Sequence, residues 1–193
     1  MSTLATQSAA GRLVVIAGCM FAGKTSALIE RLDAARRAGR RVVACKHQLD
    51  ARYDAIHLAT HDGRTFPAIA VPDVEALRRA AADADVLGVD EAQFFGPPIV
   101  GVVDELIDRG VEVIAVGIDF NVRGKPFKPF PELKARAAEV VALTSPCTKC
   151  GKPARYSQRV TPIVNGDMVG GLKDYVPRCD DCFEPWSGPL PWD

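Results

Sequence analysis

Short apolar runs alternate along the chain with segments in which apolar residues recur every three or four positions. The apolar runs, which predict strands, lie at 13–17, 41–46, 86–90, 111–117 and 140–144. The segments with helical spacing lie at 24–38, 73–83 and 98–109. Strands that are apolar on both faces and alternate with helices are typical of a parallel sheet covered by helices on both sides.

Two long stretches, 48–64 and 118–131, show neither periodicity. Loops of this length in a compact domain are usually binding loops or disordered segments. The last apolar run leads directly into a pair of cysteines at Cys147 and Cys150, so a second, smaller unit is expected after the sheet.

Length and charge set outer limits on the fold and the partners. The 193 residues suffice for one main domain and a small module. Lys and Arg together number 24, and so do Asp and Glu, so no overall field attracts nucleic acid or a membrane surface. The basic cluster at 36–41 is interpreted as the carboxyl end of a helix, where cations complement the helix dipole.

The N-terminal segment 1–11 has neither a basic start nor an apolar stretch, and no run in the chain approaches the ~20 apolar residues of a membrane span. A cytoplasmic protein without membrane association is therefore expected.

Residues 18–25, Gly-Cys-Met-Phe-Ala-Gly-Lys-Thr, form a complete phosphate-loop pattern between a predicted strand and a predicted helix. Such a loop turns successive backbone N–H groups toward one anion, while Lys24 reaches the β- and γ-phosphates and Thr25 offers its hydroxyl to Mg²⁺. The order of strand, loop and helix favours a nucleoside triphosphate site over a glycine turn with an incidental lysine.

Four of the six cysteines form two C-x-x-C pairs, Cys147 with Cys150 and Cys179 with Cys182. Four thiolates in this spacing are typical of a structural zinc site without an open coordination position. A redox pair or iron–sulfur ligation is the alternative; a redox C-x-x-C usually occurs singly beside a βαβ unit.

Two acidic residues stand at the end of the predicted strand 86–90. Asp90 is placed for a second contact to Mg²⁺, and the adjacent Glu91 could accept a proton from an attacking hydroxyl. The same pair could instead activate water in a plain ATPase. The aromatic residues Phe94 and Phe95 that follow favour a bound planar ligand.

Several motifs now occur in one order: the phosphate loop, Asp50-x-Arg52-Tyr53, the segment from Asp90 to Phe95, Lys125-Pro126-Phe127, and the two cysteine pairs. In this combination the chain resembles the type II thymidine kinases from about residue 12 to residue 183. The resemblance implies a P-loop, RecA-like α/β fold with a small zinc-ribbon and lasso domain. It implies a flexible N-terminus at 1–11, a kinase domain at 12–145, a zinc-binding domain at 146–183 and a flexible tail at 184–193.

The resemblance also implies that ATP phosphorylates the 5′-hydroxyl of thymidine, and of deoxyuridine, with Glu91 as the base. The residues implied at ATP and Mg²⁺ are Gly18, Met20, Phe21, Ala22, Gly23, Lys24, Thr25, Ser26, Asp50, Arg52, Asp90 and Gln93. Those implied at the nucleoside are Met20, Phe94, Ile118, Phe127, Ser157, Met168, Val169, Gly170 and Tyr175. Relatives are tetramers inhibited by the end-product triphosphate, so a homotetramer and inhibition by dTTP are expected.

One position departs from the family pattern. Relatives usually have a phenylalanine five residues before Phe127, and this chain has Val122 there. Either Phe120 occupies the same space or the pocket is wider.

A second interpretation is a nucleotide-switched protein in which the zinc ribbon binds nucleic acid. Such a surface would depend on Lys149, Lys152, Arg155 and Arg159, which acidic residues at 180, 181 and 184 oppose.

Overall fold

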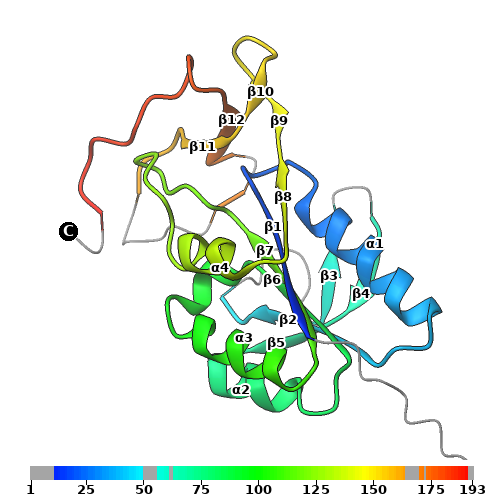
Figure 1. Ribbon diagram of the computed structural model, residues 1–193. Helices are drawn as coiled ribbons and strands as arrows, with labels where there is room; N and C mark the ends of the chain where they lie inside the picture. The colour runs from blue at the N-terminus through cyan, green and yellow to red at the C-terminus, as the bar shows by residue number, and fades with distance from the viewer. Residues whose placement is uncertain (1–10, 50–55, 61–62, 164–169, 172, 191–193) are drawn as a thin grey trace, which may run out of the picture.

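A six-stranded parallel sheet forms the centre of the molecule in the computed structural model, which describes residues 11–49, 56–60, 63–163, 170–171 and 173–190. The strand order is β5-β2-β6-β7-β1-β8 (Figure 1). These strands are β1 (Arg12–Gly18), β2 (Val42–His47), β5 (Ile69–Val71), β6 (Val86–Asp90), β7 (Glu112–Gly117) and β8 (Glu139–Leu143). The predicted parallel sheet is confirmed.

Helices cover both faces of the sheet because side chains along each strand point alternately to the two sides. In β1, Val14 and Ile16 pack against α1 (Lys24–Arg37), whereas Leu13 and Val15 join the core on the opposite face. That second face is covered by α2 (Val74–Ala80), α3 (Ile99–Asp108) and α4 (Phe130–Arg136). The three predicted helices correspond to α1, α2 and α3.

Strand β5 of the sheet was not expected from the sequence, and neither were a short hairpin and a fourth helix. A hairpin of β3 (His57–Ala59) and β4 (Thr65–Pro67) packs Leu58 and Phe66 onto the side of the sheet that carries α1. Helix α4 begins within the stretch 118–131, which the sequence analysis assigned to a loop. The hairpin strands have three residues each, too few for a periodic pattern to be recognised, and α4 begins among the prolines of 126–131, which favour a loop.

A smaller module follows β8 and rises from one edge of the sheet (Figure 1). It contains the antiparallel pair β9 (Ser145–Pro146) with β10 (Pro153–Ala154), the pair β11 (Tyr156–Arg159) with β12 (Tyr175–Arg178), and the four paired cysteines. A short 3-10 turn, η1 (Ala92–Phe95), completes the elements that have been assigned in the described residues.

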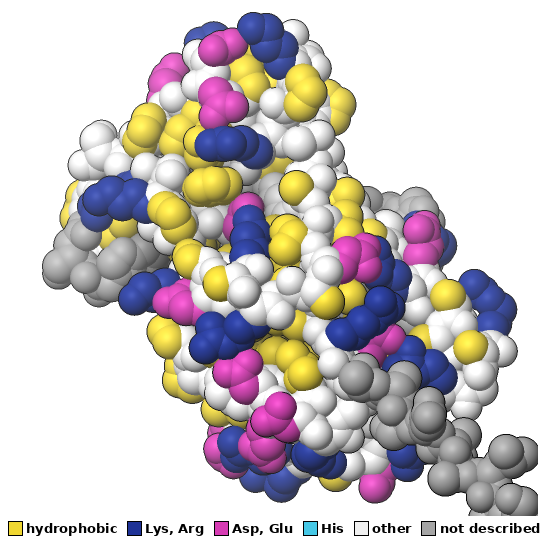
Figure 2. Space-filling view, in the orientation of Figure 1, with side chains coloured by type: hydrophobic (Ala, Val, Ile, Leu, Met, Phe, Trp, Pro, Cys, Tyr) yellow, Lys and Arg dark blue, Asp and Glu magenta, His cyan; other side chains and the backbone are white. Residues whose placement is uncertain are grey.

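Charged side chains of both signs are mixed over the face shown in Figure 2, on the module as well as on the main domain. Across the described segments, the structure holds no helix whose length and apolar character together would let it traverse a bilayer.

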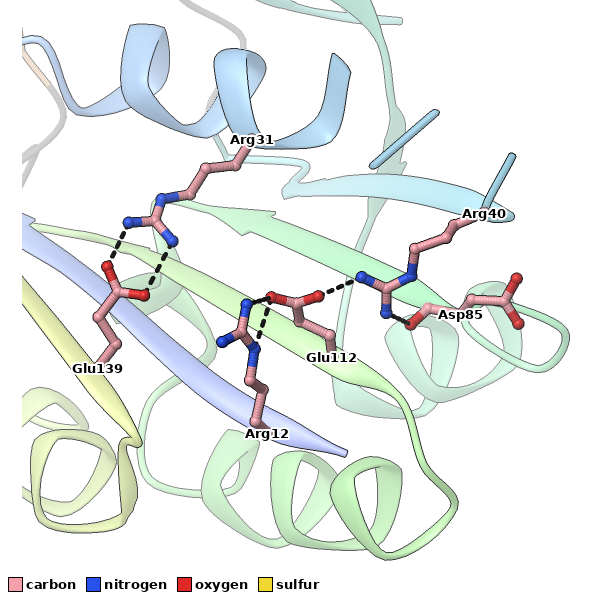
Figure 3. A network of polar contacts seen from close by, with 6 residues as sticks. All are labelled: Arg12, Arg31, Arg40, Asp85, Glu112 and Glu139. Carbon is pink, nitrogen blue, oxygen red and sulfur yellow. Dashed lines mark hydrogen bonds and ion pairs between the residues drawn. The ribbon is translucent and has the colours of Figure 1, made fainter. Parts of the chain in front are cut away.

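A network of charged residues lies at the amino ends of the strands (Figure 3), whereas the phosphate loop follows the carboxyl end of β1. Glu112, at the start of β7, accepts hydrogen bonds from Arg12 (2.6 Å) and from Arg40. Burial opposes the ionisation of Glu112, but these two guanidinium groups outweigh it and hold its pKa below the ordinary value. Arg40 also donates to the Asp85 carbonyl oxygen at 3.0 Å.

Arg41 pairs with the Asp85 carboxylate at 2.7 Å, and Arg36 pairs with Asp33 at 2.8 Å. These ion pairs support the interpretation of the basic cluster at 36–41 as the end of a helix and the turn after it.

Candidate active site

The phosphate loop links β1 to α1 and contains a backbone conformation that favours glycine. Gly23, immediately before α1, has a φ of 79°, a left-handed conformation that glycine adopts without steric cost. Phe21 also has a positive φ, 66°. The Lys24 ammonium is buried and donates to the Cys19 carbonyl oxygen at 2.8 Å, so it lies across the loop. Backbone and lysine together form the cradle that an anion needs.

The first residues of α1 face the carboxyl end of β6, although β7 lies between β1 and β6 in the sheet. The hydroxyl of Thr25 donates to the Asp90 carboxylate at 3.0 Å, and the other Asp90 oxygen accepts the backbone N–H of Glu91 at 3.0 Å. Asp90 is buried, with 4% of its surface exposed. A hydroxyl beside a carboxylate is a donor set that suits Mg²⁺, which prefers oxygen ligands.

Glu91 has a φ of 50° and a ψ of 45°, a left-handed conformation that is uncommon for a residue with a side chain. Such a conformation costs on the order of 1–3 kcal/mol and persists where the surrounding contacts impose it. Here the side-chain amide of Gln93 donates to the Glu91 carboxylate. The sharp turn therefore directs the acidic side chain at the end of β6 to a fixed partner.

Gln93 is buried in the turn that follows β6, and its side-chain oxygen accepts the backbone N–H of Ile118, just after β7, at 3.3 Å. Its place depends on Gly117, because a Cβ at that position would lie 2.1 Å from the Gln93 oxygen. Two residues that the sequence assigned to different substrates, Gln93 and Ile118, are thus in direct contact.

The phosphate loop also contacts the C-terminal module. The backbone N–H of Met20 donates to the Ser157 hydroxyl at 2.8 Å, and the Cys19 thiol contacts the Ala154 carbonyl oxygen at 3.2 Å. Both Met20 and Ser157 were expected at the nucleoside. This contact places the module directly over the loop.

A small apolar cluster lies where the module meets the loop after β7. Its buried members are Val122, Tyr175 and Leu190, and Met20, Ile163 and Trp186 pack against them. Tyr175 is also covered by the Arg159 guanidinium, at 4.9 Å from the ring centre. Met20 and Tyr175, which the sequence placed at the nucleoside, are therefore brought into one cluster.

The cluster bears on one question that the sequence left open, the space beside Val122, and on one expectation, the flexible tail. The Phe120 ring packs at a tilt against Tyr156, with ring centres 5.2 Å apart, and lies under Arg155, so it does not substitute for an aromatic at Val122. The segment after 184 was expected to be a loose tail, yet its residues Trp186 and Leu190 pack on Val122. Apolar residues in a proline-rich segment account for this difference, because they gain stability by covering other apolar surface.

The remaining predicted residues are distributed as follows. Phe94 lies beside the ring of His47, with centres 6.0 Å apart, and Phe127 forms the turn that precedes α4. Gly170 is close to Asp174, where a Cβ would lie 2.8 Å from that side chain. Gly18, Ala22 and Ser26 belong to the phosphate loop and the first turn of α1. Asp50, Arg52, Met168 and Val169 lie outside the described residues.

The four paired cysteines converge within the module. Their sulfur atoms all lie within 4.8 Å of one another, and the sulfurs of Cys150 and Cys179 are 3.5 Å apart. Four thiolates about 2.3 Å from a common zinc ion would be separated by roughly 3.8 Å, so this cluster fits a tetrahedral zinc site. Of the other two cysteines, Cys45 is buried in β2, away from this site, whereas Cys19 of the phosphate loop is buried against Cys147 and Cys179.

Lys46 was not identified from the sequence. It is a buried lysine at the carboxyl end of β2, in register with Asp90 of β6, and its ammonium donates to the His57 carbonyl oxygen at 3.0 Å. A charged residue at the end of an otherwise apolar strand was the available signal, because buried lysines are rare.

Comparison with known proteins gives a consistent result. Residues 11–183 match the sequence profile of the family described as thymidine kinase. A thymidine kinase of Deinococcus radiodurans is 45% identical over 190 residues, covering 87% of this chain and 88% of the relative. Those of Coprothermobacter proteolyticus and Porphyromonas gingivalis are 42% and 38% identical, covering 88% and 93% of this chain and 89% and 88% of the relatives.

Among solved structures, the replication initiator DnaA bound to AMPPCP and single-stranded DNA has a TM-score of 0.45 and 14% identity, covering 69% of this chain and 40% of that chain. A similarity of this size carries no weight for the site.

Proposed function

Because this chain belongs to the thymidine kinase family, we propose that Glu91 accepts the proton when the γ-phosphate of ATP passes to the 5′-hydroxyl of thymidine. The product is dTMP, and the reaction belongs to the salvage of pyrimidine deoxynucleosides. The observation that carries the proposal for Glu91 is its position: its N–H binds the same Asp90 that binds Thr25 of the phosphate loop.

The roles of the neighbouring side chains follow from charge. In the transfer, the thymidine oxygen attacks the γ-phosphorus while its proton moves to the Glu91 carboxylate and ADP departs. Lys24 stabilises the negative charge that develops on the phosphate oxygens. Arg52 and Asp50, which lie outside the described residues, belong to the proposal through the family resemblance alone.

Thr25 and Asp90 would hold Mg²⁺, which when bound neutralises charge on the ATP phosphates. The residues proposed along the phosphates are those of the loop itself, from Gly18 to Ser26, with Gln93 positioning Glu91.

Zinc is proposed as a structural ion held by the cluster of Cys147, Cys150, Cys179 and Cys182. Its four thiolate ligands leave no coordination position for a substrate, so the ion would stabilise the fold of the module. Through the module it supports the contact of Ser157 with Met20.

The nucleoside is proposed to lie beside Met20, Ile118, Ser157 and Tyr175, with Phe94, Phe127, Gly170 and the undescribed Met168 and Val169 completing its surroundings. A methyl group in an apolar site contributes only about 1–3 kcal/mol, so deoxyuridine is proposed as a second substrate. The division into a kinase domain at 12–145 and a zinc-binding domain at 146–183 is proposed on the same basis. A homotetramer, inhibition by dTTP and a cytoplasmic location remain proposals drawn from the family resemblance.

The alternative of a nucleic-acid-binding ribbon has little support from the charges on the module. Each basic residue that such a surface would use has an acidic partner. The pairs are Lys149 with Glu184 (3.8 Å), Lys152 with Asp181 (2.7 Å), Arg155 with Asp180 (3.1 Å) and Arg159 with Asp174 (3.6 Å).

The test is incubation of the purified protein with MgATP and a panel of nucleosides, with separation of monophosphate products. We expect dTMP and dUMP, and no purine product. ADP release that is independent of any nucleoside would instead indicate the plain ATPase. A parallel salt titration with single-stranded and duplex DNA tests nucleic-acid binding.

A further inference from the structure

The segment after the last zinc ligand, 183–190, follows a defined path over the loop that comes after β7. The Phe183 ring stacks on Tyr156 with centres 4.3 Å apart and lies so close to Gly124 that a Cβ there would be 2.7 Å from it. The backbone N–H of Trp186 donates to the Val122 carbonyl oxygen at 2.9 Å. The Arg123 guanidinium donates to the Gly188 carbonyl oxygen at 3.1 Å. These contacts hold the segment in register with residues 122–124.

The indole ring of Trp186 is fixed within this segment. Its Nε1 donates to the Pro189 carbonyl oxygen at 3.4 Å, and a Cβ on Gly188 would lie 2.9–3.0 Å from the ring atoms. The ring packs against the cluster of Val122, Tyr175 and Leu190 but is only half-buried itself. An indole held in place with part of its face uncovered can still contact a planar ligand.

The cluster contains Met20 of the phosphate loop and Tyr175 of β12, the two apolar residues proposed beside the nucleoside. It also contains Val122, the residue found where the family pattern has an aromatic ring. A valine is smaller than an aromatic ring, and in the described structure Trp186 packs against the cluster at that point, beside Tyr175.

We propose that Trp186 forms one wall of the nucleoside pocket, supplying from the C-terminal segment the aromatic surface that Val122 lacks, and that it determines how well a pyrimidine base fits. This inference rests on the proposed function, because the ligand it assigns is the pyrimidine nucleoside. Trp186 acts by contact with the base and takes no part in proton or phosphoryl transfer.

The experiment compares Trp186→Ala, Val122→Phe and the double variant with the wild-type protein in steady-state assays. Loss of the indole should raise KM for thymidine about tenfold and leave KM for ATP within about twofold. Val122→Phe alone should also raise KM for thymidine, since two rings then compete for one space. The double variant should return to within about threefold of wild type. Ile69→Ala, on the exposed edge strand β5, is the control and should match wild type.

A purely structural role for Trp186 predicts a different result. In that case Trp186→Ala would lower the unfolding temperature and raise the KM of both substrates together, and Val122→Phe would not rescue it. That pattern, or an unchanged thymidine KM in Trp186→Ala, overturns the proposal. Should Trp186→Ala fail to fold, Gly188→Ala displaces the ring without removing it, and the same selective rise in thymidine KM is expected.

Binding without turnover provides a second measurement. The chain has two tryptophans, so Trp192→Phe yields a protein whose indole fluorescence comes from Trp186 alone. Thymidine added without ATP should change that fluorescence in a saturable way; a flat titration in a protein that makes dTMP overturns the role of Trp186 and leaves the proposed function intact. A wild-type protein that makes no dTMP contradicts the proposed function instead.

Discussion

The side-chain amide of Gln93 donates to the Glu91 carboxylate, while the oxygen of the same amide accepts the backbone N–H of Ile118. Because its two ends have different partners, the amide cannot be reversed without the loss of both hydrogen bonds. Gln93 therefore sets the direction of the proposed base relative to β7, and we class it as a positioning residue.

Replacement of Glu91 by Gln should reduce kcat about 10²–10⁴-fold, because the variant retains the shape of the side chain but cannot accept a proton. The affinity for ATP should stay within about twofold, since Lys24, Thr25 and Asp90 are unchanged. Calorimetric titration with ATP and rapid-quench measurement of dTMP separate the two effects. Glu75→Gln, on the exposed side of α2, is the matched control. Turnover at the wild-type rate in Glu91→Gln would eliminate this residue as the base.

Gly117→Ala tests the positioning role of Gln93 without alteration of either polar residue. The new methyl group would lie 2.1 Å from the Gln93 oxygen and 2.8 Å from the Phe130 ring, so the amide must move. We expect kcat to fall about 10–100-fold, with a loss of about 1–3 kcal/mol in the free energy of unfolding. Gly101→Ala in α3, where nothing lies within 4 Å of the new methyl group, should keep wild-type activity. A normal kcat in folded Gly117→Ala would show that the direction of Gln93 is unimportant.

The cysteine cluster should bind one zinc ion per chain, measurable by elemental analysis of the purified protein. Cys182→Ser should lose the metal, lower the unfolding temperature and raise KM for thymidine before it affects ATP binding, because the module contacts Met20. Cys45→Ala, in β2 and outside the cluster, should keep its zinc. Full thymidine affinity in a metal-free preparation would argue against a link between the ion and the nucleoside site.

The Glu112 network should make stability depend on pH in the acid range. The pKa of Glu112 is lowered in the folded protein, so its stabilising effect is complete above the unfolded value of about 4.3 and is lost as pH falls through the folded value. Glu112→Gln should cost about 1–3 kcal/mol at pH 7, since Arg12 and Arg40 lose a shared partner that is itself buried.

Urea unfolding between pH 3 and pH 7 measures the difference in the free energy of unfolding between wild type and Glu112→Gln. This difference should narrow below about pH 4 as Glu112 becomes protonated. Glu30→Gln removes a carboxylate from an exposed pair with Arg64. Its free energy of unfolding should differ from that of wild type by a nearly constant amount across this pH range. A difference between Glu112→Gln and wild type that widens on acidification would contradict the assigned direction of the pKa.

Periodicity predicted the strands of the central sheet well, except for the three-residue β5, because buried parallel strands are continuous apolar runs. It failed for the β3–β4 hairpin and for α4, whose stability comes from packing on the sheet: Leu58 and Phe66 cover one face, and Phe130 and Leu133 the other. Such contacts join residues far apart in the sequence and leave no local pattern.

The site was predictable to a similar degree. The phosphate loop and the cysteine pairs have fixed spacings, and the structure brings Thr25 to Asp90 and the four sulfurs together. The burial of Gln93 beside Gly117 and the packing of Trp186 on Val122 were not predicted. Both depend on which strands and loops become neighbours, and that is settled only by the whole fold.

The dipeptide Cys19-Met20 touches the phosphate lysine through one carbonyl group and the C-terminal module through a thiol and an N–H. If ATP shifts this peptide unit, the contacts with the module beside the proposed nucleoside site change as well. Thermodynamic linkage then requires reciprocity. If bound ATP raises the affinity of the protein for the nucleoside by some factor, the bound nucleoside raises its affinity for ATP by the same factor.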